Sequence, residues 1–235
     1  QGISEKLILP QFHGREHINV NRWLKDLRNG SKGTMLSFSL NSTFSCFGDY
    51  SYMEAFDWDM PEEIETHKTI LNEGLKLFEQ IFNFSSVSFI PPCYNLDPRL
   101  YEFLFNSGVR ILQGMRVQLV PTGQFNEYKK EPHTFWEKDT SGLRFNIRNT
   151  HFEPVLNENK DWINRCLQDI SNAFLFNKPA IISSHRINYI SSISEQNGKK
   201  GLADLKKLLK EILKRWPDIE FVSTADLLKL NQVQE

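Results

Sequence analysis

Short apolar runs alternate with longer amphipathic segments along most of this chain, and the alternation limits the folds open to it. The run Val87–Ile90 is too short for a helix and fits a buried strand. The segment Leu202–Trp216 carries leucines and isoleucines three and four positions apart, which is the spacing of one helix face. Strands that alternate with helices of this length pair in parallel through right-handed crossovers. The sequence therefore predicts an α/β fold built on a parallel sheet.

The same spacing rules place the other elements. Helices are expected at Asn19–Arg28, Pro61–Phe82, Asp97–Ser107, Trp162–Phe174 and Leu202–Trp216. Strands are expected at Leu7–Phe12, Met35–Leu40, Val87–Ile90, Val109–Leu112, Ala180–Ser183 and Ile219–Val222. The polar stretch 114–154 is expected to be an irregular insertion in which Val117–Val120 pairs with Leu143–Ile147. No repeat or Gly/Ser linker interrupts the chain, so we expect a single domain over residues 1–235.

Net charge, hydropathy and cysteine spacing argue against several partners and structural features. The formal net charge is -1, which gives the whole molecule no electrostatic attraction to nucleic acid or anionic lipid. No apolar run approaches the roughly 20 residues needed to cross a bilayer, so no transmembrane segment is expected. Cys46, Cys93 and Cys166 are scattered without a CxxC pair, and we expect reduced thiols rather than a disulfide framework or a zinc ribbon. These features leave the oligomeric state and the compartment open.

Three segments with chemically active side chains follow predicted strands. His13 and His17 come after the first strand, Pro91-Pro92-Cys93-Tyr94 follows Val87–Ile90, and His185 follows Ala180–Ser183. Active sites in parallel α/β folds form at the carboxyl ends of strands, because loops and helix N-termini converge there. We therefore expect these segments to share one rim of the sheet.

The four-residue spacing of His13 and His17 suits a metal ion. If the first turn of the following helix reaches back to them, both rings face one side, about 5–6 Å apart at Cβ. Two ring nitrogens then reach one zinc ion at about 2.0–2.1 Å each. A pair of polar loop histidines is the alternative.

The residues 13–17 also match H-x-x-E-H, the motif of inverzincin-like metallopeptidases, with Glu16 as the base. That motif requires a continuous helix, whereas Gly14 and the strand before it favour a loop. His185 suits proton transfer, because an imidazole changes charge near neutral pH and can protonate a leaving group. A hydrogen-bonded core histidine is the alternative for His185.

These three strand-end segments, taken in their order along the chain, resemble motifs of the polysaccharide deacetylases of the NodB type. His13-Gly14-Arg15-Glu16-His17 resembles the family's H-[ST]-x-x-H metal motif, with Gly14 in place of the hydroxyl residue. Phe89-Ile90-Pro91-Pro92-Cys93-Tyr94 resembles the R-x-P-[YF] segment that lines the substrate groove, without its arginine. The run from Ala180 to His185 resembles the late strand that ends in a catalytic histidine. The likeness covers about Leu7 to Leu228.

The resemblance implies a fold, an activity and a set of site residues. The fold is an irregular parallel β/α barrel of the glycoside hydrolase and deacetylase type, incomplete at its N-terminus. The activity is metal-dependent removal of acetyl groups from an N- or O-acetylated carbohydrate. His13 and His17 would bind a divalent metal, zinc first, together with an Asp, and His185 would protonate the departing amine. Pro92 and Tyr94 would line the groove.

Other residues are further candidates for substrate binding. Arg15 lies between the two histidines of the metal motif, and His151 and Glu153 lie in the expected insertion, where an ordinary loop is the alternative.

One part of the family pattern has no counterpart here. The family's T-[FY]-D-D-G motif supplies the base and the metal Asp on a strand before H-x-x-x-H, and no Asp precedes His13. We expect those residues to lie upstream of Gln1. A non-catalytic glycan-binding relative of the deacetylases is the alternative.

Overall fold

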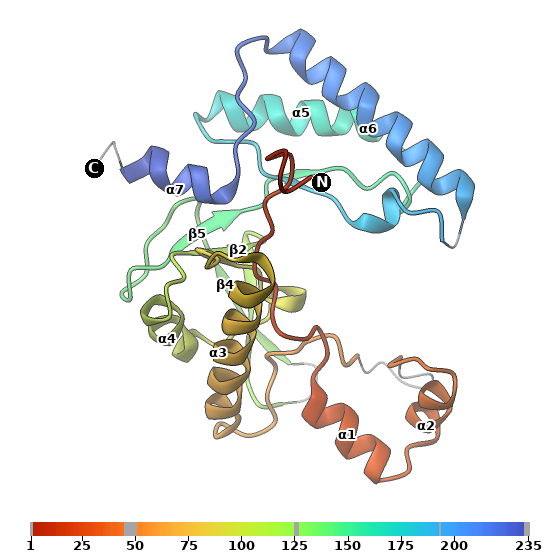
Figure 1. The fold of residues 1–235 in the computed structure, drawn as a ribbon, viewed down its shortest axis with the longest axis vertical. Helices are drawn as coiled ribbons and strands as arrows, with labels where there is room; N and C mark the ends of the chain where they lie inside the picture. The colour runs from red at the N-terminus through yellow and green to blue at the C-terminus, as the bar shows by residue number, and fades with distance from the viewer. Residues whose placement is uncertain (1, 45–50, 125–126, 193, 233–235) are drawn as a thin grey trace. The chain divides into compact units, whose positions relative to one another are not determined.

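The computed structural model of this protein describes residues 2–44, 51–124, 127–192 and 194–232 (Figure 1). The chain divides into two compact units, unit 1 with residues Gln1–Asn146 and Ser223–Glu235, and unit 2 with residues Ile147–Val222. The helices are α1 (Val20–Arg28), α2 (Lys32–Ser39), α3 (Glu63–Phe82), α4 (Tyr101–Asn106), α5 (Trp162–Leu175), α6 (Glu195–Arg215) and α7 (Thr224–Gln232), with 3-10 turns at η1 (Pro92–Tyr94), η2 (Pro98–Leu100) and η3 (Arg186–Asn188). The strands are β1 (Ser88–Phe89), β2 (Ile111–Gly114), β3 (Val117–Pro121), β4 (Tyr128–Pro132), β5 (Arg144–Ile147), β6 (Thr150–His151) and β7 (Ile182–Ser183).

Unit 1 is built on the sheet β1-β2-β5. β1 and β2 are parallel, with Ser88 opposite Ile111 and Phe89 opposite Leu112. Phe12 joins the same sheet through one parallel bridge to Phe89. The predicted α/β class with parallel strands is confirmed, and the described strands form three small sheets rather than a closed barrel.

The core of unit 1 lies between this sheet and α3. The ring centroids of Phe12 and Phe89 are 5.2 Å apart, and Phe78 of α3 packs edge-on against Phe12 at 6.3 Å. Gly74 permits this close approach, because a Cβ at that position would lie 2.9 Å from Cζ of Phe12. Helix α3 ends at Phe82, and the left-handed backbone of the next residue, Asn83 (φ 58°), caps its last turn.

Unit 2 is a parallel β6-β7 pair covered by α5 and α6. Thr150 lies opposite Ile182 and His151 opposite Ser183. Figure 1 shows α5 and α6 running side by side, and their apolar faces form one buried cluster with the residue that follows β6. The cluster consists of Phe152, Cys166, Leu167, Ile170, Leu208 and Ile212. Both helices begin with a side-chain cap. The Asp161 side chain accepts a hydrogen bond from the Asn164 N–H in α5, and the Ser194 side chain accepts one from the Asn197 N–H in α6.

Three predicted strands are wrong. Met35–Leu40 falls largely on helix α2, and the side chains that suggested a strand, Met35 and Phe38 among them, are exposed. In the predicted strand Leu7–Phe12, Phe12 joins a sheet through its single bridge to Phe89, but Leu7 is 76% exposed. Ile219–Val222 belongs to none of the strands among the described residues.

The expected insertion also differs from the prediction. Val117–Pro121 pairs with Tyr128–Pro132 in an antiparallel hairpin, and not with the segment around Leu143. The nearer partner closes the shorter loop, which costs less chain entropy. The segment around Leu143 contributes β5 to the sheet beside β2, and Thr150–His151 forms a strand in place of a loop.

Cys93 and Cys166 are free thiols, as expected, and Cys46 lies outside the described residues. Within the described ranges, no helix combines the length and the apolar character needed to cross a bilayer.

Candidate functional site

A buried carboxylate contacts an exposed imidazole in unit 2. The Nδ1 atom of His185 lies 2.7 Å from Oε1 of Glu153. The Glu153 side chain is 6% exposed, whereas that of His185 is 67% exposed. An ionised carboxylate only accepts hydrogen bonds, so Nδ1 of His185 is the donor and carries the proton. The His185 ring is therefore accessible to solvent, and the buried Glu153 carboxylate sets its orientation and its tautomer.

Two further donors hold the Glu153 carboxylate. Its Oε2 atom accepts a hydrogen bond of 2.7 Å from Nδ2 of Asn188 and one of 3.3 Å from the backbone N–H of His185. Asn188 is fully buried, and its Oδ1 accepts from the backbone N–H of Val155 at 3.1 Å. A buried charge is costly unless hydrogen bonds replace its hydration, and here three donors do so. The carboxylate is thus fixed before any substrate arrives.

The parallel register of β6 and β7 explains why the two residues meet. His151 lies opposite Ser183, so Glu153 and His185 stand two residues beyond paired positions on adjacent strands. The hydrogen bond from Phe152 N–H to Ser183 O, 3.0 Å, continues the register past the strand ends. The carboxyl ends of two parallel strands therefore carry the pair, as expected for a site in an α/β fold.

In unit 1, the rings of His13 and His17 lie close together. Their centroids are 5.1 Å apart and their planes are inclined by 75°. Nδ1 of His13 lies 2.7 Å from the Ile90 carbonyl, just beyond β1, and Nδ1 of His17 lies 3.1 Å from the Met53 carbonyl. Since a carbonyl only accepts, Nδ1 is protonated in each of these bonds, and Nε2 is the unprotonated nitrogen of a neutral ring. This is the arrangement that orients histidines for metal binding through Nε2.

The His13–His17 pair offers two side chains, which is fewer than a catalytic zinc ion takes from a protein, namely three. Among the residues that the structure describes, no group of three His, Cys, Asp or Glu side chains is placed to hold a metal.

The segment between the two histidines is a loop, and α1 begins only at Val20. Gly14 adopts φ 108°, a conformation that favours glycine, and an ideal Cβ there would lie 3.1 Å from the backbone oxygen of Glu16. A continuous helix over residues 13–17, which the peptidase interpretation with Glu16 as base requires, is absent. Glu16 instead accepts two hydrogen bonds from Arg15.

The remaining predicted residues of unit 1 are Arg15, Pro92 and Tyr94. Arg15 is also paired with Glu73 of α3. Pro92 is buried, and Cys93 and Tyr94 follow it with left-handed backbones (φ 53° and 56°). The Cys93 thiol donates to the Met53 carbonyl at 3.5 Å. Burial, with the nearby Glu54 carboxylate, raises the pKa of Cys93 to about 11, so it is a thiol at neutral pH and not a nucleophile.

The structure thus groups the predicted residues in two sets, one in each unit. His13, His17, Arg15, Pro92 and Tyr94 belong to unit 1. His185, Glu153 and His151 belong to unit 2, where Glu153, predicted to bind substrate, contacts His185 instead.

Sequence reasoning missed Asn188, the buried donor to Glu153, because a lone Asn after a histidine carries no recognisable signal. No protein-family model, no curated protein and no solved structure matches this chain, so both sites are interpreted from their own geometry.

Proposed function

We propose that this chain is a hydrolase of acetylated carbohydrates in which His185 delivers a proton to the leaving group. One observation carries the proposal: the buried Glu153 carboxylate lies 2.7 Å from Nδ1 of the exposed His185 ring. This is the arrangement by which an acid fixes a catalytic imidazole and stabilises its protonated form. The substrate class comes from the resemblance to the polysaccharide deacetylases, which also supplies the proposed barrel fold.

The role of His185 follows from the chemistry of an amide. When water adds to the acetyl carbon and the carbon–nitrogen bond breaks, the nitrogen must take up a proton to leave as an amine. With Nδ1 directed at Glu153, the doubly protonated ring gives this proton from Nε2 and becomes the neutral, Nδ1-protonated ring. Nε2 then regains a proton that the attacking water releases. The products are acetate and the free amino sugar. Proton transfer by a positioned side chain contributes about a hundredfold to ten-thousandfold in rate.

In the same proposal, His13 and His17 are two ligands of a divalent metal ion, and zinc is the metal that we propose. The protonated Nδ1 of each ring, directed at a backbone carbonyl, supports this assignment. The other ligands would be the carboxylates that the family carries on a preceding strand. Arg15, Pro92, Tyr94 and His151 remain proposed substrate contacts.

The alternative proposal is a non-catalytic glycan-binding relative of the deacetylases. Such a protein would bind saccharides equally well with and without a metal chelator.

Acetate release from chitooligosaccharides in the presence of Zn²⁺ separates the two functions. The deacetylase proposal predicts release that falls at least about a hundredfold in His185→Gln and Glu153→Gln. Glu195→Gln is the matched control, because Glu195 is an exposed acid of the same unit, paired with Lys199 on α6, and its activity should stay unchanged. If saccharides bind with the same affinity in the presence and absence of a metal chelator, and no acetate is released, the chain is the non-catalytic glycan-binding protein.

A further inference from the structure

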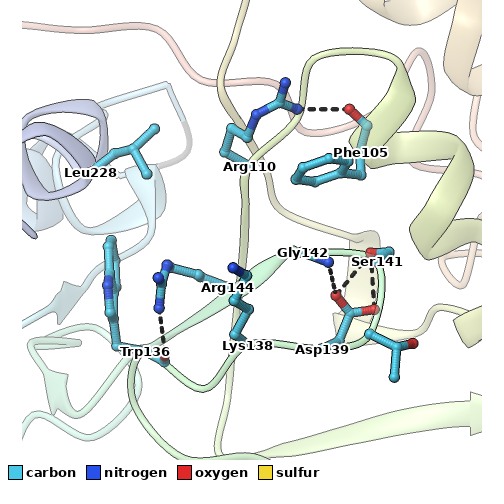
Figure 2. Close-up of a pocket in the computed structure, with 10 residues that line it drawn as sticks. Phe105, Arg110, Trp136, Lys138, Asp139, Ser141, Gly142, Arg144 and Leu228 are labelled. Atoms are coloured by element: carbon cyan, nitrogen blue, oxygen red, sulfur yellow. Dashed lines mark hydrogen bonds between the residues drawn. The ribbon is translucent and has the colours of Figure 1, made fainter. Parts of the chain in front are cut away.

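Unit 1 contains a pocket of about 420 Å³ that shares no residue with either histidine site. It lies between α4, the residues leading into β2, the hairpin around residues 136–144, and α7 (Figure 2). Its volume falls within the range of small-molecule sites, roughly 300–1,000 Å³. Figure 2 shows Arg110 and Phe105 on one side of the pocket and Trp136, Arg144 and Lys138 across from them.

Three cationic residues lie on neighbouring backbone segments at this pocket. The backbone N–H of Arg144 donates to the Arg110 carbonyl at 2.9 Å, and Lys138 forms an antiparallel bridge with Arg144. Like charges at adjacent positions of paired segments repel each other. No carboxylate in the described part of the chain forms an ion pair with Arg110 or Lys138. The Arg110 guanidinium donates to the carbonyls of Phe105 and Val109, at 2.7 and 2.9 Å, so Arg110 and Lys138 keep a positive charge that a bound anion would offset.

The acidic residue in the lining does not neutralise this row by direct pairing. Oδ1 of Asp139 accepts hydrogen bonds from the backbone N–H groups of Gly142 and Leu143, at 3.0 and 2.8 Å. Both of its oxygens also lie within 3.0 Å of the Ser141 hydroxyl. The carboxylate thus closes the turn of the hairpin and shapes the pocket floor.

Trp136 has two unusual features in the same pocket. Its backbone is left-handed, with φ 67°, which is rare for a bulky residue and marks positions where the surroundings enforce a conformation. Its indole Nε1 is buried and has no hydrogen-bond partner among the described residues. A buried donor without an acceptor is costly, which is a second sign that the surroundings enforce this position of the side chain. Phe135 stacks against the indole at 5.6 Å and supports its plane.

We propose that this pocket binds a monosaccharide-sized ligand that carries one anionic group, a carboxylate or a phosphate. The anion is recognised by Arg110, Lys138 and Arg144, of which the guanidinium groups match either oxyanion in two-point geometry. The Trp136 side chain, whose ring centroid lies 5.7 Å from Cζ of Arg144, adds an aromatic surface for a sugar ring. Thr140 and Ser141 add hydroxyl groups to the lining, which suit a polyhydroxylated ligand.

A nucleotide fits this lining less well. The lining offers basic groups and hydroxyls, but no Asn or Gln amide of the kind that reads the edge of a base. The anionic sugar and the nucleotide share the phosphate, so the test must compare them directly.

Isothermal titration calorimetry at low salt, with the full chain, tests the proposal. Glucuronate and glucose 6-phosphate are titrated as the carboxylate and phosphate probes, with glucose and AMP as comparisons. We expect one or both anionic sugars to bind at least about tenfold more tightly than glucose, since a charge-assisted hydrogen bond is worth about that factor. The tighter of the two probes identifies the anionic group. Equal binding of glucose, tighter binding of AMP, or no binding by either anionic sugar would overturn the proposal.

Variants locate the site. Lys138→Ala should weaken binding of the anionic sugar about tenfold, whereas Lys130→Ala, which removes an exposed lysine from β4 of the same unit, should leave binding unchanged. Trp136→Ala removes the indole ring from the lining, and it should weaken binding of glucuronate and of glucose by a similar factor. If Lys130→Ala and Lys138→Ala weaken binding equally, the anion is attracted by general charge and the pocket assignment is wrong. Because this assay measures neither acetate nor zinc, its outcome is independent of the deacetylase proposal.

Discussion

The Glu153 carboxylate and the His185 imidazole, 32 positions apart in the chain, meet at 2.7 Å across the ends of two adjacent parallel strands. The difference in exposure between them gives each a separate task. Glu153, at 6% side-chain exposure, is fixed and cannot reach a ligand in solution, while the ring of His185 can. In the proposed hydrolase, Glu153 positions the ring and His185 is the residue that reacts.

The first prediction concerns the tautomer of His185. Because Glu153 only accepts, the neutral His185 ring should carry its proton on Nδ1, and the same holds for His17 beside the Met53 carbonyl. Long-range proton–nitrogen NMR spectra of the neutral rings distinguish the two tautomers. In Glu153→Ala, the proton of His185 should redistribute to Nε2, while the His17 signals stay unchanged as the internal control. A proton on Nε2 of His185 in the unaltered protein would contradict the pairing.

The second prediction concerns the support beneath Glu153. Gly201 of α6 packs so tightly against η3, the turn that precedes this helix, that a Cβ there would lie 1.7 Å from the backbone oxygen of Asn188. Alanine is the better helix former by about 1 kcal/mol, but forced contact with backbone costs about 1–3 kcal/mol or more. We expect Gly201→Ala to lower the free energy of unfolding by about 2 kcal/mol in urea and to shift the Asn188 amide signals.

Ala203→Gly on the same helix is the matched control for that substitution. Ala203 is exposed, so its change reports helix propensity alone, a loss of about 1 kcal/mol. A stabilising effect of Gly201→Ala would show that propensity outweighs the contact, and that α6 does not constrain Asn188.

Local signals account for the parts of the fold that were predicted correctly. The long helices α3, α5 and α6 follow from apolar spacing, and the cap at Asp97 from the Asp-Pro pair, whose carboxylate accepts from the Arg99 N–H. The error at Met35–Leu40 has a physical reason too. Alternation of apolar and serine residues over six positions is short, and here those residues form a helix whose apolar side chains remain largely exposed.

Long-range pairing decided the parts of the site that were not predicted. The closeness of His13 and His17 was predicted from a helical turn, whereas in the structure the two rings meet in a loop before α1. The contact of Glu153 with His185 depends on the register of β6 against β7, and β6 lies in a stretch interpreted as a loop. Asn188 reaches Glu153 only because η3 follows His185 directly. No single segment of the sequence contains that information.

The third prediction concerns zinc at His13 and His17. Two imidazoles without a further protein ligand among the described residues should bind Zn²⁺ weakly, and a chelator should remove it readily. Calorimetric titration should give an affinity that falls about tenfold or more in His13→Ala and in His17→Ala, as expected for the loss of a ligand. His151→Ala, in unit 2, is the control and should leave the affinity unchanged. Equal zinc affinity in all three variants and the unaltered protein would remove these residues from any metal site.

The fourth prediction is a dependence of stability on pH that arises from His67. This residue of α3 is 3% exposed, its ring packs edge-on against Phe56, and Nδ1 has no hydrogen-bond partner among the described residues. Burial lowers the pKa of His67 to about 4, although the acids Glu63, Asp57 and Asp97 oppose the shift. The unfolded chain, with a pKa near 6.5, then binds more protons than the folded chain between pH 6.5 and pH 4. The stability contributed by neutral His67 is therefore present above pH 6.5 and is lost as the pH falls through this window.

Urea unfolding at pH 7 and pH 5 measures this effect. Linkage gives a loss of about 2 kcal/mol in the free energy of unfolding from His67 between these two values. His67→Gln has no group that titrates there, so its loss should be smaller by that amount. Burial also lowers the pKa of His133, but His133 contributes equally to both proteins, and the difference between them isolates His67. If the two proteins lost the same stability between pH 7 and pH 5, His67 would be protonated in the folded state, and its surroundings would have to be more hydrated than the packing of α3 against Phe56 allows.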